Sequence, residues 1–524
     1  MNKNRLLSSL IAVMAVLAAD AQNPAAPKLV VGILIDQLRS DYLQAFMPLY
    51  GEGGFKRLMT QGRVYTQGEY PLTSVDRASA AATLSTGSTP FYHGIVGQQW
   101  FERATLRRID CVEDADCKGV ATDHGASPQF LAVSTIGDEL KVASDGKSLV
   151  YAIAPFRDAA VLTAGHAADA AVWIDDETGN WCTSDYYGSL PGWANSRDLY
   201  HPLEKQLKRY TWEPFYERNG DYSYYLSDGT TEPFEHEFKG QGRYRAFKTS
   251  APVNEEVATL AGDCLRTTGI GNDSFTDYLA LTFYAGNYKH LPASKAPMEL
   301  QDTYVRLDKA LSDIIEAVDR KVGLANALFV VTSTGYCDEQ PADLQKFRIP
   351  TGTFDIKRAA ALLNMYLMAV YGQGNYVEAC FGPEIYLNKK LIEEKQLYLT
   401  EVMNRTQDFL IQLSGVKDVY SSQRILLGTW TPDLSRLRNS YNSQTSGDIL
   451  VQVAPGWRFV NEDTGEDHLV GNDYIPFPII FYGYNTKAET VTTPTGVDYI
   501  APTLSKAMRI RAPNACLATP LSGF

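Results

Sequence analysis

The sequence predicts an α/β fold in which a doubly wound, mostly parallel sheet carries helices on both faces. Three observations lead to this prediction. Short, continuous apolar runs recur along the chain, which is typical of parallel strands buried on both sides. Apolar residues at helical spacing occupy segments between these runs. Two longer stretches break the alternation, and they predict a lid insertion and a small α+β cap.

The first apolar run covers residues 29–35 (LVVGILI) and ends at Asp36. Ligands of doubly wound sheets bind at the carboxyl ends of the strands, so Asp36 is a candidate functional residue. Residues 304–318 repeat apolar side chains at helical spacing and predict a helix packed on the sheet. Four further runs predict strands: 148–154 (SLVYAIA), 278–283 (YLALTF), 327–332 (ALFVVT) and 478–482 (PIIFY).

The two interruptions divide the chain into a core and two additions. Residues 184–269 form an insertion that is rich in Tyr and Trp, and we interpret it as a lid. Residues 351–425 contain a helical pattern, two short strands around Gly382 and a second helical pattern, which predicts the cap. The core is then expected to comprise residues 22–183, 270–350 and 426–524.

The N-terminal residues have the pattern of a cleavable signal peptide. Lys3 and Arg5 precede an apolar run over residues 6–18, and Ala19-Asp20-Ala21 is a small-x-small cleavage site. We therefore expect a signal peptide over residues 1–21 and a periplasmic or secreted mature protein. The run is too short to span a bilayer comfortably, and no other stretch is long and apolar enough. An integral membrane protein is therefore not expected.

Composition excludes some partners and leaves others open. Lys and Arg number 48 against 61 Asp and Glu, a net charge of −13, so a general nucleic-acid binder is not expected. The Tyr-rich insertion would suit a protein partner or a glycan. Among the seven cysteines, Cys111 and Cys117 are the best candidates for a disulfide, since they bracket a short acidic loop.

One segment resembles a known enzyme superfamily. Residues 85–97 (STGSTPFYHGIVG) are similar to the Thr-Gly-x-x-Pro-x-x-His-Gly-Ile segment of the alkaline phosphatase superfamily. Within it, the chain resembles the type I phosphodiesterase/nucleotide pyrophosphatase branch and related bacterial periplasmic alkaline phosphatases. Other segments agree in order along the chain: Asp36 with the following QLRSDYL, 134–140 (STIGDEL) with 164–173 (AGHAADAAVW), 327–332 leading to Gly335, and 497–504 (VDYIAPTL).

The resemblance implies an alkaline-phosphatase-like fold and a two-zinc site. Two zinc ions clamp the phosphoryl group, and a Thr or Ser attacks phosphorus. The nucleophile position falls on Arg77, which cannot attack. Ser74 or Ser79 could serve only if the loop register differs.

Few of the implied metal ligands are kept. Asp36 matches the first-strand ligand of one zinc ion. Asn287, His290 and His468 stand near the ligand positions of the other, and none of these three carries a negative charge. Two ligand positions hold other residues, Ser333 and Thr334. The ligand set that remains predicts at most weak zinc binding.

The phosphate-contacting positions are altered as well. The Asn of the family falls on Gln98, and a Lys/Arg pair falls near residues 156–158, so that the Lys is missing and Arg157 is displaced by one position. Arg77, Gln98 and Arg157 are therefore candidate contacts for a phosphate- or sulfate-containing small molecule. We interpret His93 and His166 as packing or hydrogen-bonding residues.

Two functions follow from these substitutions. The first is an exported member of the superfamily that has lost most of its catalytic residues and acts by binding a ligand or a partner. The second is an active zinc-dependent phosphatase or phosphodiesterase that uses an altered metal set and Ser74 or Ser79.

Overall fold

The computed structural model describes residues 25–215, 234–338, 351–428, 431–471 and 475–524. The expected signal peptide lies outside the described residues. Among those described, no helix combines the length and the apolar character needed to cross a bilayer.

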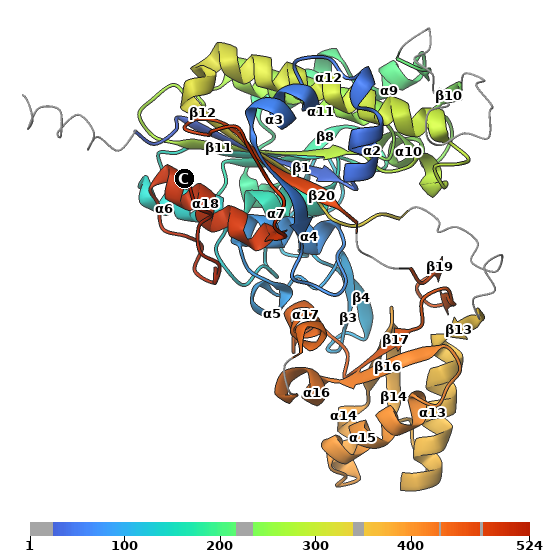
Figure 1. Cartoon of the computed structure of the whole chain (residues 1–524). Helices are drawn as coiled ribbons and strands as arrows, with labels where there is room; N and C mark the ends of the chain where they lie inside the picture. The colour runs from blue at the N-terminus through green and yellow to red at the C-terminus, as the bar shows by residue number, and fades with distance from the viewer. Residues whose placement is uncertain (1–24, 216–233, 339–350, 429–430, 472–474) are drawn as a thin grey trace, which may run out of the picture.

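An eleven-stranded sheet forms the core, and the predicted strands lie at its centre (Figure 1). Strand β1 (Leu29–Asp36) pairs in parallel with β11 (Asp277–Tyr284) on one side and with β12 (Ala327–Ser333) on the other. All eight residues of β1 are buried, because helices cover both faces of the sheet and its apolar run has no water-facing side.

The parallel order continues on one side and changes direction on the other. Beyond β11, strands β6 (Val150–Ile153) and β7 (Ala170–Ile174) are parallel to it. Beyond β12, strand β20 (Phe477–Gly483) is antiparallel, and β2 (Arg63–Glu69) pairs antiparallel with β20. The predicted mostly parallel sheet is thus confirmed, and all five apolar runs lie in strands.

Helices cover both faces of the sheet, as predicted. On one face α11 (Pro252–Thr267) packs against α12 (Pro297–Val322), the helix predicted over 304–318. On the other face α4 (Arg77–Thr86) packs against α7 (Arg157–Ala164), and α18 (Ile500–Met508) lies beside them (Figure 1).

The Tyr- and Trp-rich insertion packs onto the core. It contains α8 (Gly192–Tyr200), α9 (Leu203–Leu207), the short pair β9 (Thr211–Trp212) and β10 (His236–Glu237), and α10 (Arg243–Lys248). Trp212 is fully buried, and its indole Nε1 donates to Asp302 of α12 at 2.6 Å. The last part of the predicted lid range is α11, a helix that covers the sheet.

The cap has a hydrophobic core of its own. Helices α13 (Ile356–Tyr371) and α15 (Leu399–Leu410) pack on a four-stranded sheet of β14 (Val377–Phe381), β15 (Glu384–Leu387), β17 (Ile449–Val453) and β16 (Val416–Ser421). Strand β13 (Thr353–Asp355) pairs with β18 (Arg458–Asn461), which pairs with β19 (Glu466–Leu469). The cap therefore extends beyond the expected 351–425, because strands returning after residue 425 complete both of its sheets.

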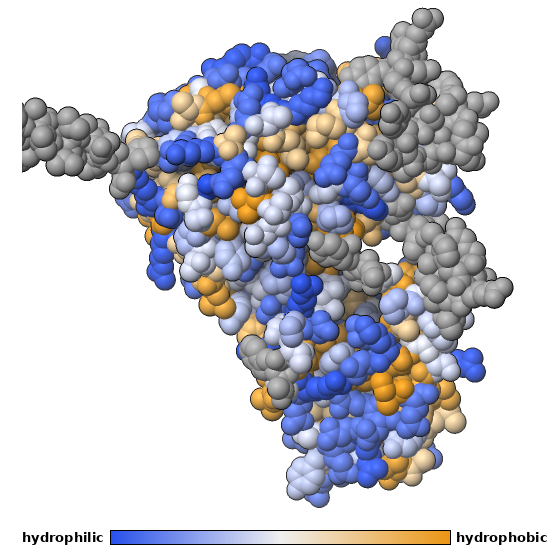
Figure 2. Space-filling view, viewed as in Figure 1, coloured by the Kyte–Doolittle hydropathy of each residue, from blue (hydrophilic) through white to orange (hydrophobic). Residues whose placement is uncertain are grey.

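The molecular surface agrees with the acidic, polar composition. On the face shown in Figure 2, hydrophilic residues predominate, and hydrophobic residues occur in small groups over the core and the cap. The predicted disulfide is absent, since Cys111 and Cys117 are both free thiols. Cys111 is fully buried, whereas the Cys117 thiol donates to Asp114.

Candidate functional site

The carboxyl ends of the central strands meet at Asp36. This residue ends β1 in register with Tyr284 of β11, and Thr334 follows β12 directly. The Thr334 hydroxyl donates to Asp36 Oδ1 at 3.0 Å. Asp36 is completely buried, and this burial raises its pKa to about 6 even though Arg77 opposes the shift. A buried carboxylate at this edge needs a positively charged partner.

Asp76 and Ser79 fix the beginning of helix α4 with a capping box. Asp76 Oδ1 accepts from the backbone N–H of Ser79 at 2.9 Å, and the Ser79 hydroxyl oxygen accepts from the N–H of Asp76 at 3.0 Å. This arrangement satisfies two backbone donors at the helix start. Ser79 is almost completely buried and its hydroxyl is held within the cap, so it does not fit the role of nucleophile. Ser74 is exposed in the preceding loop.

Arg77, the first residue of α4, lies between two buried carboxylates. Its Nε donates to Asp158 at 2.9 and 3.1 Å, and its Nη1 donates to Asp36 at 3.3 Å. Its guanidinium also stacks over the Phe156 ring, with 3.7 Å between the guanidinium carbon and the ring centroid. Burial alone would raise the pKa of Asp158, but the charge and hydrogen bonds of Arg77, together with the N–H of Ala159 and the charge of Lys248, outweigh it and the net shift is downward. Arg77 is therefore the counter-charge of this site.

The first turn of α7 brings Asp158, and not Arg157, to this centre. Gln98 also donates to Asp158, from Nε2 at 3.1 Å. Arg157 pairs instead with Asp110 at 3.1 Å. Neighbouring helical residues point about 100° apart, so residues 157 and 158 cannot both face Arg77. Two of the three predicted anion contacts, Arg77 and Gln98, thus converge on a carboxylate that the sequence reasoning did not single out.

The predicted metal ligands are not assembled into one site. Asn287 is buried and donates to the carbonyl of Leu291 at 2.9 Å. His290 is half exposed and pairs with Asp338 at 2.7 Å, a contact that raises its pKa. His468 lies exposed on β19 in the cap, where its ring contacts Phe459.

The zinc-ligand assignments remain predictions, and the surroundings of the assigned residues show how well they fit a metal ion. Within the described parts of the chain, no group of three or more His, Cys, Asp or Glu side chains is arranged to hold a metal ion. Both oxygens of Asp36 already have partners, one of which is a permanent cation. The Ser333 hydroxyl donates to the carbonyl of Leu38. A dinuclear zinc cluster needs several anionic or imidazole ligands around each ion, and these residues do not provide them.

A cavity of about 630 Å³ opens in front of Arg77, and all three parts of the structure line it. Arg77, Gln98, Phe156 and Asp158 line it from the core, α10 contributes Lys248, and the cap contributes Phe381, Thr464 and Glu466. This volume is within the range of small-molecule sites.

Lys248 is a second site residue that sequence reasoning missed. It is 5% exposed, donates from Nζ to the carbonyl of Ile174 at 3.0 Å, and pairs with Asp176. Its ammonium lies 5.2 Å from the centroid of the Phe156 ring. Burial lowers its pKa. An amine from the insertion thus lies over the segment where the family's Lys was expected, but with a carboxylate partner of its own.

The family match covers most of the chain. A model of the type I phosphodiesterase/nucleotide pyrophosphatase family matches residues 30–476. The chain belongs to this family. Its relatives include the alkaline phosphatase PafA of Elizabethkingia meningoseptica, with 28% identity over 95% of this chain and 94% of the relative. The alkaline phosphatase PhoV of Synechococcus elongatus shares 29% identity over 95% and 92%.

A third relative and a solved structure are also similar to this chain over nearly its full length. A protein of Myroides odoratus that is named a calcium-transporting ATPase shares 29% identity over 94% of each chain. The crystal structure of PafA superposes with a TM-score of 0.82 at 27% identity, over 96% of this chain and 99% of that one. The alkaline-phosphatase-like fold and the superfamily assignment predicted from the sequence are thus confirmed.

Proposed function

We propose that this member of the family binds a small molecule in the cavity and does not hydrolyse phosphoric esters. The observation that carries the proposal is the position of Arg77, where the resemblance expects the nucleophile. A permanently charged guanidinium cannot attack phosphorus. Because it is hydrogen-bonded to Asp158 and Asp36, it also does not leave Asp36 free for a metal ion. Hydrolysis in this superfamily depends on both functions.

Metal analysis combined with hydrolysis assays tests this proposal. We expect the purified protein to contain less than stoichiometric zinc and to show no turnover of a chromogenic phosphomonoester or phosphodiester, with or without added zinc. An active alkaline phosphatase from the same family, assayed in parallel, controls for the conditions. Two tightly bound zinc ions with turnover would overturn the proposal.

The second candidate is an active hydrolase that uses Ser74. Its support is the similarity over nearly the full length to proteins named as alkaline phosphatases. If turnover is found, Ser74→Ala should abolish it, whereas Thr73→Ser should leave it intact. Turnover that survives Ser74→Ala would exclude this nucleophile.

The charge of the cavity wall bears on the ligand. Seven carboxyl side chains and five Arg or Lys side chains line the cavity, so the wall has an excess of negative charge at neutral pH. The phosphate- or sulfate-binding role predicted for Arg77 and Gln98 is not supported by these neighbours, because both side chains already donate to Asp158. We therefore propose a ligand that carries no dianionic group.

We accordingly expect millimolar inorganic phosphate to leave the melting temperature unchanged. A dianion in the cavity beside Arg77 would face the carboxylate of Asp158, and the charge of Arg77 is already shared between Asp158 and Asp36. Differential scanning fluorimetry, with sodium chloride at equal ionic strength as the control, measures the effect. A phosphate-specific rise that Gln98→Ala removes and Arg157→Ala retains would contradict the prediction.

We also propose that the protein is exported. The charged and apolar N-terminal segment followed by Ala19-Asp20-Ala21 supports this. We expect the mature chain to begin at Gln22. Mass spectrometry of the intact protein from the periplasm or medium would measure this. Protein that is exported with residues 1–21 retained would rule out this cleavage site.

A further inference from the structure

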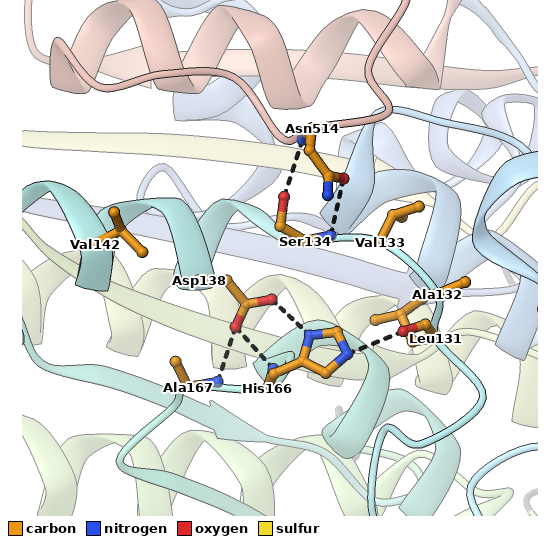
Figure 3. A pocket seen from close by; sticks show the side chains of 9 residues that line it. All are labelled: Leu131, Ala132, Val133, Ser134, Asp138, Val142, His166, Ala167 and Asn514. Carbon is orange, nitrogen blue, oxygen red and sulfur yellow. Dashed lines mark hydrogen bonds and ion pairs between the residues drawn. The ribbon is translucent and has the colours of Figure 1, made fainter.

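A second cluster of ionisable groups lies away from the cavity described above. Asp138 is in the first turn of α6 (Ile136–Ala143), and His166 lies in the loop between α7 and β7. Together with the loop 131–134 and Asn514 they line a shallow hollow of about 280 Å³ (Figure 3). None of these residues has a role in the proposed function.

Both ring nitrogens of His166 face hydrogen-bond acceptors. Nδ1 lies 2.8 Å from Asp138 Oδ2, and Nε2 lies 2.9 Å from the backbone carbonyl oxygen of Leu131 (Figure 3). A backbone carbonyl can only accept a hydrogen bond. A neutral imidazole has one N–H, so it could satisfy only one of these two contacts.

The Asp138 carboxylate is held in its ionised, accepting form. It accepts from the backbone N–H groups of Thr135, His166 and Ala167, each at 2.8 Å, in addition to the His166 ring. Burial opposes the anion, but the hydrogen bond with His166 and the backbone donors outweigh it, so the pKa of Asp138 is lowered. With two acceptors fixed at its two nitrogens, the ring makes both hydrogen bonds only as the imidazolium.

This ring connects three segments that are distant in sequence. Leu131 belongs to the loop that ends at Ser134, where the backbone N–H donates to Asn514 Oδ1 at 3.1 Å. The N–H of Asn514 donates back to the Ser134 hydroxyl at 2.9 Å. The loop 131–134 therefore joins His166 and α6 to the C-terminal segment that follows α18.

We infer that His166 is an imidazolium clamp, which fixes the loop 131–134 and the C-terminal segment at neutral and acidic pH and loosens when its ring loses a proton. In the neutral ring one nitrogen carries a lone pair that faces an acceptor. One of the two contacts is then lost. We expect it to be the contact to the Leu131 carbonyl, because this acceptor is uncharged, whereas Asp138 is an anion.

The surrounding groups agree with a protonated ring. From α6, Glu139 lies nearby and accepts from the Ser134 hydroxyl at 2.7 Å, and Lys141 pairs with Asp169, the residue that precedes β7. From the 3-10 helix Asp185–Tyr187, the hydroxyls of Tyr186 and Tyr187 donate to the carbonyls of His166 and Gly165. Burial raises the pKa of both tyrosines, so they stay neutral.

The pKa values of His93 and His166 also agree with a protonated His166 ring. Burial lowers the pKa of His93, whose carbonyl accepts from Ala132, to about 3, so it adds no positive charge. The bond to Asp138 raises the pKa of His166 above its usual 6.5, although burial opposes the shift. Because the folded-state pKa of His166 is raised, the stabilisation by the clamp is lost as the pH rises through that value. Below pH 6.5 the stabilisation persists until the pH is low enough to protonate Asp138, whose pKa is lowered.

Two measurements on the full-length mature protein test the clamp. Proton NMR of the histidine rings, assigned by comparison with His166→Gln, should give His166 a pKa above 6.5. Asp138→Asn should lower that pKa, because it removes the carboxylate but keeps a similar shape. A His166 pKa at or below 6.5 in the parent protein would overturn the inference.

Hydrogen exchange measures the consequence for the attached segments. Peptides that contain residues 131–134 and Asn514 should exchange faster in His166→Gln than in the parent at pH 6, and the difference should disappear at high pH. His201→Gln, at an exposed histidine, is the matched control and should change neither peptide. Equal exchange in parent and variant at pH 6, or a difference that does not depend on pH, would reject the clamp.

Discussion

Arg77→Leu is expected to lower the free energy of unfolding by about 3–5 kcal/mol, the usual cost of removing one partner from a buried ion pair. The substitution leaves Asp36 and Asp158 buried without their shared cation. Leucine keeps much of the packing against Phe156, so the loss reports mainly on charge. Urea denaturation at pH 7.5, followed by circular dichroism, measures it.

Arg157→Ala is the matched control for this prediction. Arg157 begins α7 as Arg77 begins α4, and it too pairs with a carboxylate, but this pair is partly exposed, with 23% and 27% of the two side chains accessible. Exposed pairs contribute about 0–1 kcal/mol. The double variant Arg77→Leu/Asp158→Leu should regain part of the loss, since it removes one of the two orphaned charges. If Arg77→Leu costs no more than Arg157→Ala, Arg77 is not the counter-charge of the site.

The loss in Arg77→Leu should also depend on pH. Asp36 has a folded-state pKa of about 6 against 3.8 in the unfolded chain, so folding favours its protonated form. Stability from this group is present below pH 3.8 and is lost as the pH rises through about 6. Without Arg77 the folded-state pKa rises further, so the variant should recover stability relative to the parent as the pH falls from 7.5 toward 5.

The sequence predicted the framework of the site better than its contacts. Buried parallel strands have continuous apolar runs, and β1, β11 and β12 were identified by that pattern, which also placed Asp36 at the correct edge. The direction of β20 was not predictable, because antiparallel and parallel central strands have the same apolar pattern.

The sequence predicted some contacts of the site wrongly for two reasons. The direction of a side chain is not visible in the sequence, and residues far apart along the chain can meet in the fold. Asp158 and Arg157 are neighbours in sequence, and only the start of α7 decides which of them faces Arg77. Lys248 approaches from the insertion, far in sequence from Phe156. His468 precedes β20 closely in sequence, but β19 belongs to a cap sheet. None of these relations has a local signal in the sequence.

A repaired variant would show whether the metal ligands alone have been lost or the scaffold as well. Ser333→Asp and Thr334→His restore two ligands beside Asp36, Arg77→Thr restores the nucleophile position, and Asn287→Asp adds a carboxylate. The structure supports the placement of one change in particular, since residue 334 already contacts Asp36. We expect zinc content to rise from near zero to about one ion per chain, because each anionic or imidazole ligand adds to metal affinity.

The triple variant that keeps Arg77 is the control for this experiment. Its guanidinium still binds Asp36, so it should take up less zinc than the quadruple variant. Zinc should raise the melting temperature of the quadruple variant and not of the parent, because an ion that binds only the folded state stabilises that state. Hydrolysis is expected to remain weak, because the groups that orient the ligands are not restored. If the folded quadruple variant binds no more zinc than the parent, the assignment of residues 333, 334 and 287 to ligand positions is wrong, and an enzyme with a different metal set becomes the better explanation.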